Sequence, residues 1–433
     1  MAELFTDLPE QAAAPPAHRP APRLIRAERR QVELRAVTLD ELVSDDHLAR
    51  LVWDIVQRFD FAPLLDTIAA RAGKPGHPQT DPAILVALWL YATLDGLGSA
   101  RELARLCAQH AAYRWLSGGV GINHHTLSDF RVGHADWLDG ELVRGVYGLM
   151  AAGEVDLAAV AQDGMRVRAA AASASFRRAP RLALLRAKAE ARVAALKNQL
   201  NTDPTRHSRQ AAARGRAARE RLARVEAAQA AMPEARERKQ RNKGKPEQAR
   251  VSTTDAEAQV MHMPDGGFRP AYNVQFAAET GHGLLVVVAV DTSGADQAAL
   301  EPVHAAIAEN YGHAPDNYLV DGGFASQQGI ETVMARGSRL HAPVVGALDK
   351  RHSPALSAWR ALMQSAAGKA LYRLRGQTIE WVNAGARNRG LYAVNVRGRA
   401  KVRAVVLWQA LAHNLRCVLR VPSLRQRAWL AAA

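Results

Sequence analysis

The stretch DNYLVDGGFAS, residues 316–326, places a carboxylate, Asp321, at the end of a short apolar run and follows it with two glycines. A carboxylate in such a place is costly to remove from water unless it is paired or coordinates a metal. The apolar run before it is typical of a buried strand bounded by a turn. The stretch therefore predicts a strand that ends at a paired or metal-binding acid, and that acid requires partners elsewhere in the chain.

Three earlier segments are also predicted strands, because they are short, rich in Val, Tyr and Phe, and bounded by Gly or Asp. They are VDLAAVAQDGMRVRAAAA (155–172), AYNVQFAAET (271–280) and GLLVVVAVD (283–291). The last two flank a TGHG turn, which predicts a hairpin. The helix-length segment 296–312 then leads to the strand before Asp321, and strand, helix, strand implies a parallel crossover. The pattern predicts an α/β fold, a mixed sheet with helices packed on it.

A second acid, Asp163, lies in the first of these strands, in the apolar setting AVAQDGMRV. Neighbouring strands are about 4.8 Å apart, so if the first and fourth strands are neighbours, Asp163 and Asp321 can reach one divalent cation. Magnesium takes such hard oxygen ligands and relieves the repulsion between them. The glycines that follow each acid would let a phosphate backbone approach. The alternative for each acid alone is a carboxylate that caps a turn.

A third acid is expected on a helix beside the sheet, and Glu380 in LYRLRGQTIEWVNAGARNRGL is the candidate. Arg387 follows seven residues later, nearly two helical turns, so both side chains share one face. That face would offer a metal ligand and a cation for a phosphate. The alternative is an amphipathic helix with an ion pair, and Glu301 and Glu331 are rival helical acids.

The positive charge is concentrated in one segment. The chain of 433 residues has 57 Lys+Arg against 42 Asp+Glu, a net charge of +15, and residues 177–250 alone hold 21 Lys/Arg and 7 Asp/Glu. The remainder is therefore almost neutral. This Ala/Arg-rich segment predicts an inserted, largely helical arm that contacts DNA phosphates; the alternative is a solvated helical spacer.

Residues 38–152 have a helical pattern, flanked by a Pro/Ala-rich tail at 1–37. Asp81 before Pro82 predicts one helix start, and Ser99 three residues before Glu102 predicts a capping box. Thr126 is predicted to begin a helix over 126–138 that enters the major groove as part of a helix-turn-helix, with Arg131 contacting bases. A plain packing or dimerisation bundle is the alternative.

Several classes are excluded by what the sequence lacks. The two cysteines are far apart, which argues against a disulfide framework or a zinc site. No apolar run reaches the roughly 18 residues that a membrane span needs. We therefore expect a soluble, cytoplasmic protein without a membrane partner.

Together these segments resemble the DDE transposases of bacterial insertion sequences, in the large group with a Tyr-Arg-Glu-Lys signature. The resemblance runs from about residue 45 to 420, through DPAILVALWLYATLDGLGSARELARLCAQHAAYRWLSGG, HHTLSDFR, AQDGMRV, YLVDGGF and TIEWVNAGARNRGLYAVNVRGRAKVRAVVLWQALAHNL. It implies an RNase H-like catalytic domain at 153–420, interrupted by the arm at 177–250, an all-α N-terminal domain at 38–152 and a tail at 421–433. It also assigns residues: Asp163, Asp321 and Glu380 as catalytic and metal-binding acids, Tyr372, Arg375 and Arg387 at the other signature positions, and Lys401, within RGRAKVR, on DNA.

The sequence departs from the signature at a few positions. Arg387 replaces the usual lysine, and one extra residue separates Arg375 from Glu380. Phe324 occupies a position that is often tyrosine in such proteins, and Asn383 and Ala384 occupy two positions that are often Phe-Gly.

The resemblance implies phosphoryl transfer with two Mg²⁺ ions, for which Mn²⁺ can substitute. The partners are double-stranded DNA, namely the terminal inverted repeats and target DNA, bound by a homodimer in the nucleoid of a bacterial cytoplasm. Two other functions fit the same residues. One is a non-catalytic or degenerate DNA-binding protein, and the other is an RNase H-like nuclease.

Overall fold

The computed structural model describes residues 36–425, apart from 72, 74–75, 203–208, 345–347 and 349–351. Most of the predicted tails, 1–37 and 421–433, therefore lie outside the described residues. The chain from Leu39 onward forms one compact unit. No described helix is both long enough and apolar enough to cross a membrane.

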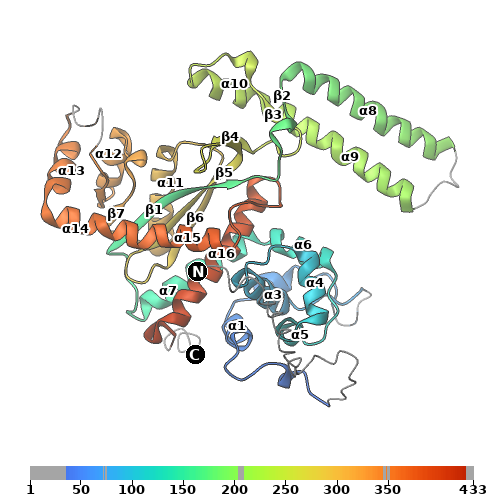
Figure 1. Ribbon diagram of the computed structural model, residues 1–433, viewed down its shortest axis with the longest axis horizontal. Coiled ribbons are helices and arrows are strands. Elements are labelled where there is room, and N and C mark those ends of the chain that lie inside the picture. The colour runs from blue at the N-terminus through green and yellow to red at the C-terminus, as the bar shows by residue number, and fades with distance from the viewer. Residues whose placement is uncertain are drawn as a thin grey trace, which may run out of the picture. The chain divides into compact units, whose positions relative to one another are not determined.

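The N-terminal part is helical, as the apolar periodicity predicts (Figure 1). Its central helix, α3, is buried along almost its whole length. The predicted starts are confirmed for two helices: Asp81 accepts from Ala83 N at 2.8 Å before Pro82, and the Ser99 hydroxyl accepts from Glu102 N at 3.3 Å. The helices are α1 (Leu48–Val56), α2 (Ala62–Asp66), α3 (Pro82–Leu94), α4 (Ala100–Gln109), α5 (Ala111–Ser117), α6 (His124–Gly133) and α7 (Ala135–Ala151).

The bounds predicted for the helix over 126–138 are wrong at both ends. Helix α6 begins at His124, because Asn123 caps it by accepting from His125 N at 2.9 Å, and Thr126 lies within its first turn. The helix ends at Gly133, and α7 starts two residues later. The side-chain amide of Asn123 offers an earlier cap than Thr126, and asparagine is the stronger capping residue.

The sheet is mixed, as predicted. Its order is β4-β5-β1-β7-β8, and β6 also pairs with β5. Strands β5 and β6 form the expected antiparallel hairpin, and α11 (Gln297–Tyr311) is the crossover to β7, ending at the left-handed Gly312. Strands β1 and β7 are parallel neighbours. The strands are β1 (Ala159–Arg168), β4 (Gln259–His262), β5 (Phe268–Glu279), β6 (Leu285–Asp291), β7 (Asn317–Leu319) and β8 (Arg339–His341).

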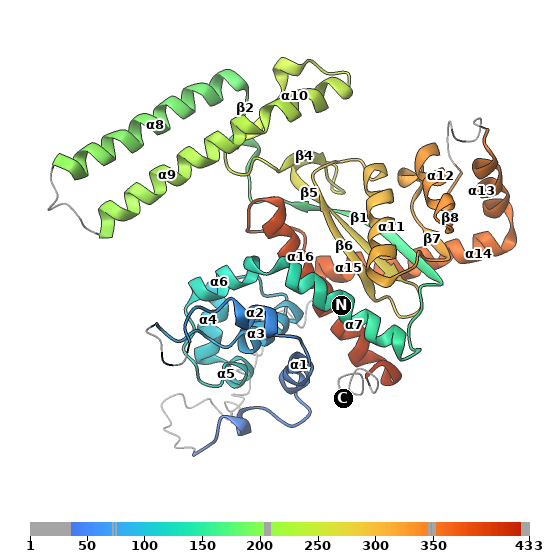
Figure 2. The ribbon, with the colours of Figure 1, turned by 180° about the vertical axis from the view of Figure 1, so that it is seen from behind.

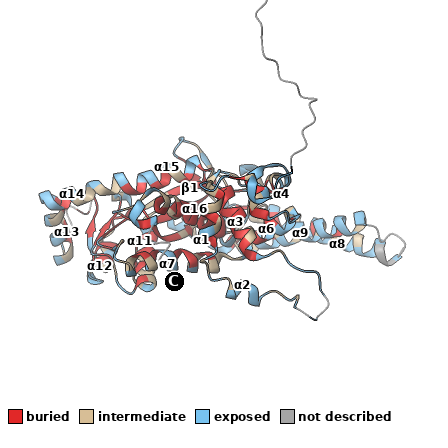
Figure 3. Ribbon diagram, turned by 90° about the horizontal axis from the view of Figure 1, so that it is seen from below, coloured by how far each residue is buried: buried red, intermediate tan, exposed pale blue. Residues whose placement is uncertain are grey.

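Helices cover both faces of this sheet (Figures 1 and 2). One face packs against α11, with α12 (Gln327–Ala335) and α13 (Pro354–Gln364) beyond it. The other packs against α15 (Trp381–Asn388) and α16 (Arg399–Arg420), which follow α14 (Ala366–Arg375). Helix α16 is buried along most of its length and also contacts α3, α6 and α7, so one continuous core joins the helical part to the sheet (Figure 3).

The predicted arm lies between β1 and β4. Its helices are α8 (Ala179–Thr202), α9 (Arg209–Ala230) and α10 (Met232–Arg241), and α8 and α9 lie side by side. The short strands β2 (Phe176–Arg177) and β3 (Val251–Ser252) pair at its base. A small apolar cluster that includes Leu182, Met232 and Val251 packs the base, whereas most residues of α8 and α9 are exposed (Figure 3).

Candidate active site

The two acids carried by neighbouring strands, Asp163 and Asp321, lie opposite each other when the strand register is extended. In the parallel β1–β7 pair Ala159 is opposite Asn317 and Ala161 is opposite Leu319. Extending this register by two residues sets Asp163 opposite Asp321, just beyond the end of β7. The condition for the two acids to share a site, that their strands are neighbours, is thus met. Asp321 is exposed, and its carboxylate also accepts from Gly322 N, so the turn-capping alternative describes part of its role.

Arg375 links the helical acid to the sheet. Its guanidinium lies 3.3 Å from Asp163 Oδ1 and 3.4 Å from Glu380 Oε1. Only 12% of the Arg375 side chain is exposed, whereas 64% of Glu380 is. One largely enclosed cation therefore holds a carboxylate of β1 beside the carboxylate of Glu380. We call Asp163, Asp321 and Glu380 the acid cluster.

A π-helical turn, Gly376–Glu380, separates α14 from α15. A π-helix closes over five residues rather than four and is found mostly as a single turn at functional sites. Arg375 and Glu380 are five residues apart and still form an ion pair. The π-helical turn therefore keeps Arg375 and Glu380 on one side of the helix across a five-residue separation.

Asn383, at a position that departs from the signature, supports Asp163 directly. Its side-chain amide donates to Asp163 Oδ2 at 3.0 Å, and Asn383 is buried. Burial raises the pKa of Asp163; Arg375 and the N–H of Gly164 lower it, and the charges of Asp296 and Asp321 raise it. Sequence reasoning missed this role of Asn383, because only the fold brings residue 383 to β1.

The remaining predicted residues divide into two groups. Tyr372 lies within electrostatic reach of the acid cluster: burial raises its pKa, the charge of Arg375 lowers it, and the charges of Asp321, Glu380 and Asp163 raise it. Arg387 is exposed in the last turn of α15, and Lys401 is exposed in the first turn of α16. Within the described part of the chain, no ion pair or side-chain hydrogen bond joins either cation to the acid cluster.

The expectation that Gly164 makes room for a phosphate is wrong. A Cβ at this position would collide with the side chains of Asp296 and Gln275. Asp296, just before α11, accepts from Asn273 at 2.7 Å and from Gln275 at 3.1 Å. The space that a side chain would need at Gly164 is therefore occupied by a polar network on the α11 face of the sheet. Gly323, in contrast, has open space around it.

The three acids of the cluster are not close enough together to bind one metal ion jointly. Among the described residues, no group of three or more His, Cys, Asp or Glu side chains is close enough to hold a metal ion. Their donor chemistry nevertheless suits Mg²⁺, since they are hard oxygen ligands. Asp163 and Glu380 also converge on one positive group, the guanidinium of Arg375. The site can hold a cation between carboxylates, and in this structure an arginine does so.

Arg131, the predicted base-contacting residue, is turned toward the protein. Its guanidinium lies 4.8 Å from the ring centroid of Trp89 and donates to Gly98 O at 2.6 Å. Its backbone carbonyl accepts from Trp408 Nε1 at 2.9 Å. These contacts join α6 to α3 and α16. They favour a packing role, and base contact by Arg131 stays a prediction.

We predict that Arg131→Ala lowers the free energy of unfolding by about 1–3 kcal/mol, because it removes a cation–π contact and a hydrogen bond. Urea denaturation measures this, and Arg101→Ala, at an exposed position of α4, is the matched control, with an expected change within about 0.5 kcal/mol. Unchanged stability together with weaker binding to one DNA sequence only would restore Arg131 as a base contact.

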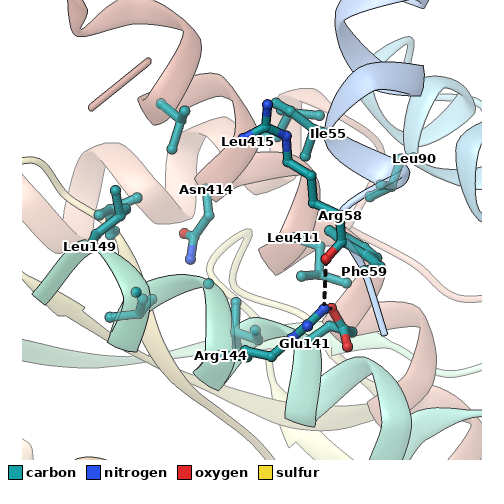
Figure 4. A pocket seen from close by; sticks show the side chains of 16 residues that line it. Ile55, Arg58, Phe59, Leu90, Glu141, Arg144, Leu149, Leu411, Asn414 and Leu415 are labelled. Atoms are coloured by element: carbon teal, nitrogen blue, oxygen red, sulfur yellow. Dashed lines mark hydrogen bonds and ion pairs between the residues drawn. The ribbon is translucent and has the colours of Figure 1, made fainter. Parts of the chain in front are cut away.

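A separate cavity of about 200 Å³ lies among α1, α3, α7 and α16 (Figure 4). Most of its lining is apolar, and the polar groups that line it are already bonded within the protein. Asn414 exchanges two hydrogen bonds of 2.8 Å with the backbone of Leu285, and Glu141 pairs with Arg144 and accepts from Asp60 N. We assign it to packing between the helical part and α16.

Comparison with known proteins adds one finding. Residues 37–133 match the model of a family described as a transposase domain (DUF772). The match ends at Gly133, the last residue of α6, so it covers α1 to α6 and includes neither α7 nor the sheet. No curated protein and no solved structure matches the chain. The match supports a transposase, an enzyme that processes DNA.

Proposed function

We propose that the protein is a DDE transposase that cleaves DNA at the ends of its mobile element and joins them to a target. The observation that carries this proposal is the convergence of Asp163 and Glu380 on Arg375, with Asp321 level with Asp163. Three carboxylates from two neighbouring strands and one helix are the ligands such chemistry requires. The strand order also agrees with an RNase H-like sheet, in which a hairpin precedes the parallel strand that carries the second acid.

Asp163, Asp321 and Glu380 would hold the Mg²⁺ ions. When bound, Mg²⁺ activates the attacking oxygen and neutralises the leaving oxygen of an in-line displacement. The chain's own residues prepare this site: Asn383 fixes the carboxylate of Asp163. Arg375 neutralises Asp163 and Glu380 until a cation replaces it, and its planar guanidinium then suits a DNA phosphate. Arg387, in the last turn of α15, would bind the DNA phosphate next to the one that Arg375 contacts.

The choice of Glu380 is tested by exchanging single acids for amides. We predict that Glu380→Gln reduces Mg²⁺-dependent cleavage of DNA that carries the element's ends by at least about a hundredfold, since it removes a charged ligand. Glu331→Gln is the control, because Glu331 lies on α12 and accepts from Gln327 at 3.1 Å, a contact that glutamine can keep. Activity that survives in the first variant and disappears in the second would show that the third acid is on α12.

A non-catalytic DNA-binding protein is the second candidate. It is favoured by the spacing of the acids, because no group of three or more among the described residues is close enough to hold a metal ion. The two proposals differ in one measurement: strand cleavage that requires a divalent cation occurs only with the first. Joining of the cleaved strand to a second DNA then separates a transposase from an RNase H-like nuclease.

A further inference from the structure

A large open cleft lies where the arm meets the sheet, away from the acid cluster. Its volume is about 1280 Å³. One wall is α10 with the chain that follows it, and the other is β4, the start of β5 and the segment between β6 and α11. Figures 1 and 2 both show α10 beside β4. We call this the arm-root cleft.

The walls of the arm-root cleft are positively charged. Arg178, Lys239, Arg241 and Arg250 line it and are all exposed. The lining includes six cations, with Arg238 and Arg399 beside these four, against two acids, Glu234 and Asp291, and Glu234 already pairs with Arg238 at 3.3 Å. The cleft therefore presents uncompensated cations to its contents, which selects a polyanion.

An exposed apolar patch lies among these cations. Phe268 is 69% exposed and Val260 is 48% exposed. Both line the cleft from the antiparallel β4–β5 pair, where the His262 ring packs edge-on against Phe268 at 5.2 Å. Phosphates alone do not need an aromatic ring, whereas an unpaired base stacks on one. Cations that follow a backbone together with an aromatic platform are the features of single-stranded nucleic acid sites.

The arm-root cleft is separate from the acid cluster, because Asp163, Asp321 and Glu380 are not among the residues that line it. Gln275 lines the cleft and bonds to Asp296 beside α11. Its register partner is Gly164, and neighbouring residues of a strand point to opposite faces. Asp163 accordingly points to the α15 face, where Asn383 holds it. The Gln275 wall of the cleft therefore faces away from Asp163, and DNA that contacts only the cleft lining is not positioned for cleavage by the acid cluster.

We propose that the arm-root cleft binds single-stranded DNA, with phosphates on the exposed cations and a base stacked on Phe268. The choice of DNA as the ligand rests on the proposed function. The volume also favours a strand over a metabolite, because it exceeds the roughly 300–1,000 Å³ of small-molecule sites.

The test is fluorescence anisotropy with the full chain and a labelled oligothymidine of about 15 nucleotides, beside a duplex of equal length. Phe268→Ala is expected to weaken binding of the single strand roughly tenfold and that of the duplex far less, and Phe268→Tyr to retain binding. Tyr147→Ala, at another exposed aromatic residue on α7, is the control and should change neither. Equal losses on both DNAs, or no loss, would overturn the proposal.

The role of the cations is tested by the salt dependence of DNA binding. Lys239→Gln with Arg241→Gln should reduce the slope of log K against log salt by about 0.7 per lost contact on the single strand. An unchanged slope would overturn their assignment. The cleft and the transposase proposal can fail separately. If the protein binds single-stranded DNA through Phe268 but cleaves no DNA, only the catalytic proposal is rejected. If Phe268→Ala both cleaves and binds DNA normally, only the cleft proposal is rejected.

Discussion

Asp163→Asn is expected to abolish Mg²⁺-dependent DNA cleavage, with a loss of at least about a thousandfold, while DNA binding is retained. A metal contributes several kcal/mol to stabilising the transition state, and the substitution removes the charge that would hold it. Asparagine keeps the shape of the side chain and an oxygen that can accept from Asn383. Because the variant loses a negative charge, its attraction to DNA does not fall. Cleavage of labelled DNA and a binding titration at one salt concentration measure the two effects.

Asp321→Asn should behave in the same way, since Asp321 is level with Asp163. The matched control is Asp316→Asn, an exposed acid at the other end of the same strand, five residues earlier. This variant should cleave like the unmodified protein. Full cleavage by either Asp163→Asn or Asp321→Asn would remove that acid from the site, and loss of DNA binding in parallel with cleavage would indicate misfolding instead.

The strands that carry the acids were predictable because they are apolar and bounded by glycine or a charge. The helix-length connection before the fourth strand predicted a parallel crossover. That the fourth strand is the neighbour of the first was only a condition at that stage, and the fold meets it, since β1 and β7 are parallel neighbours. Strands β4 and β8, of four and three residues, were not predicted. They are too short to show an alternating pattern, and their pairing depends on neighbours that are distant in sequence.

The contacts around Asp163 were not predictable, because they join segments more than 200 residues apart. Asn383 donates to Asp163 across 220 residues, and no local pattern relates the two. The role of Gly164 was misassigned for a similar reason. A glycine after an acid suggested space for a ligand, but Asp296 and Gln275 from two other segments fill that space. Local sequence shows that a position must be small and does not show what occupies the space.

The π-helical turn is tested by changing its length. Inserting one alanine after Gln377 should abolish cleavage, because each added helical residue rotates the preceding helix by about 100° relative to α15. Arg375 would then turn away from Asp163 and Glu380, with which it now forms ion pairs. Gln377 is exposed, so the insertion itself creates no clash with the core. The DNA-cleavage assay measures the loss, and thermal unfolding checks that the protein remains folded.

Deleting Gln377 is the matched control, with the opposite expectation. A π-helical turn is an α-helix with one residue added, so removing one residue should restore a continuous α-helix from α14 to α15. Arg375 and the acid would then be four residues apart, a separation at which side chains on an α-helix meet. The deletion should therefore retain the Arg375–acid pair and most of the cleavage. If the deletion abolished cleavage while the insertion preserved it, the π-helical turn would not be what keeps Arg375 facing the acids, and the extra residue would need another explanation.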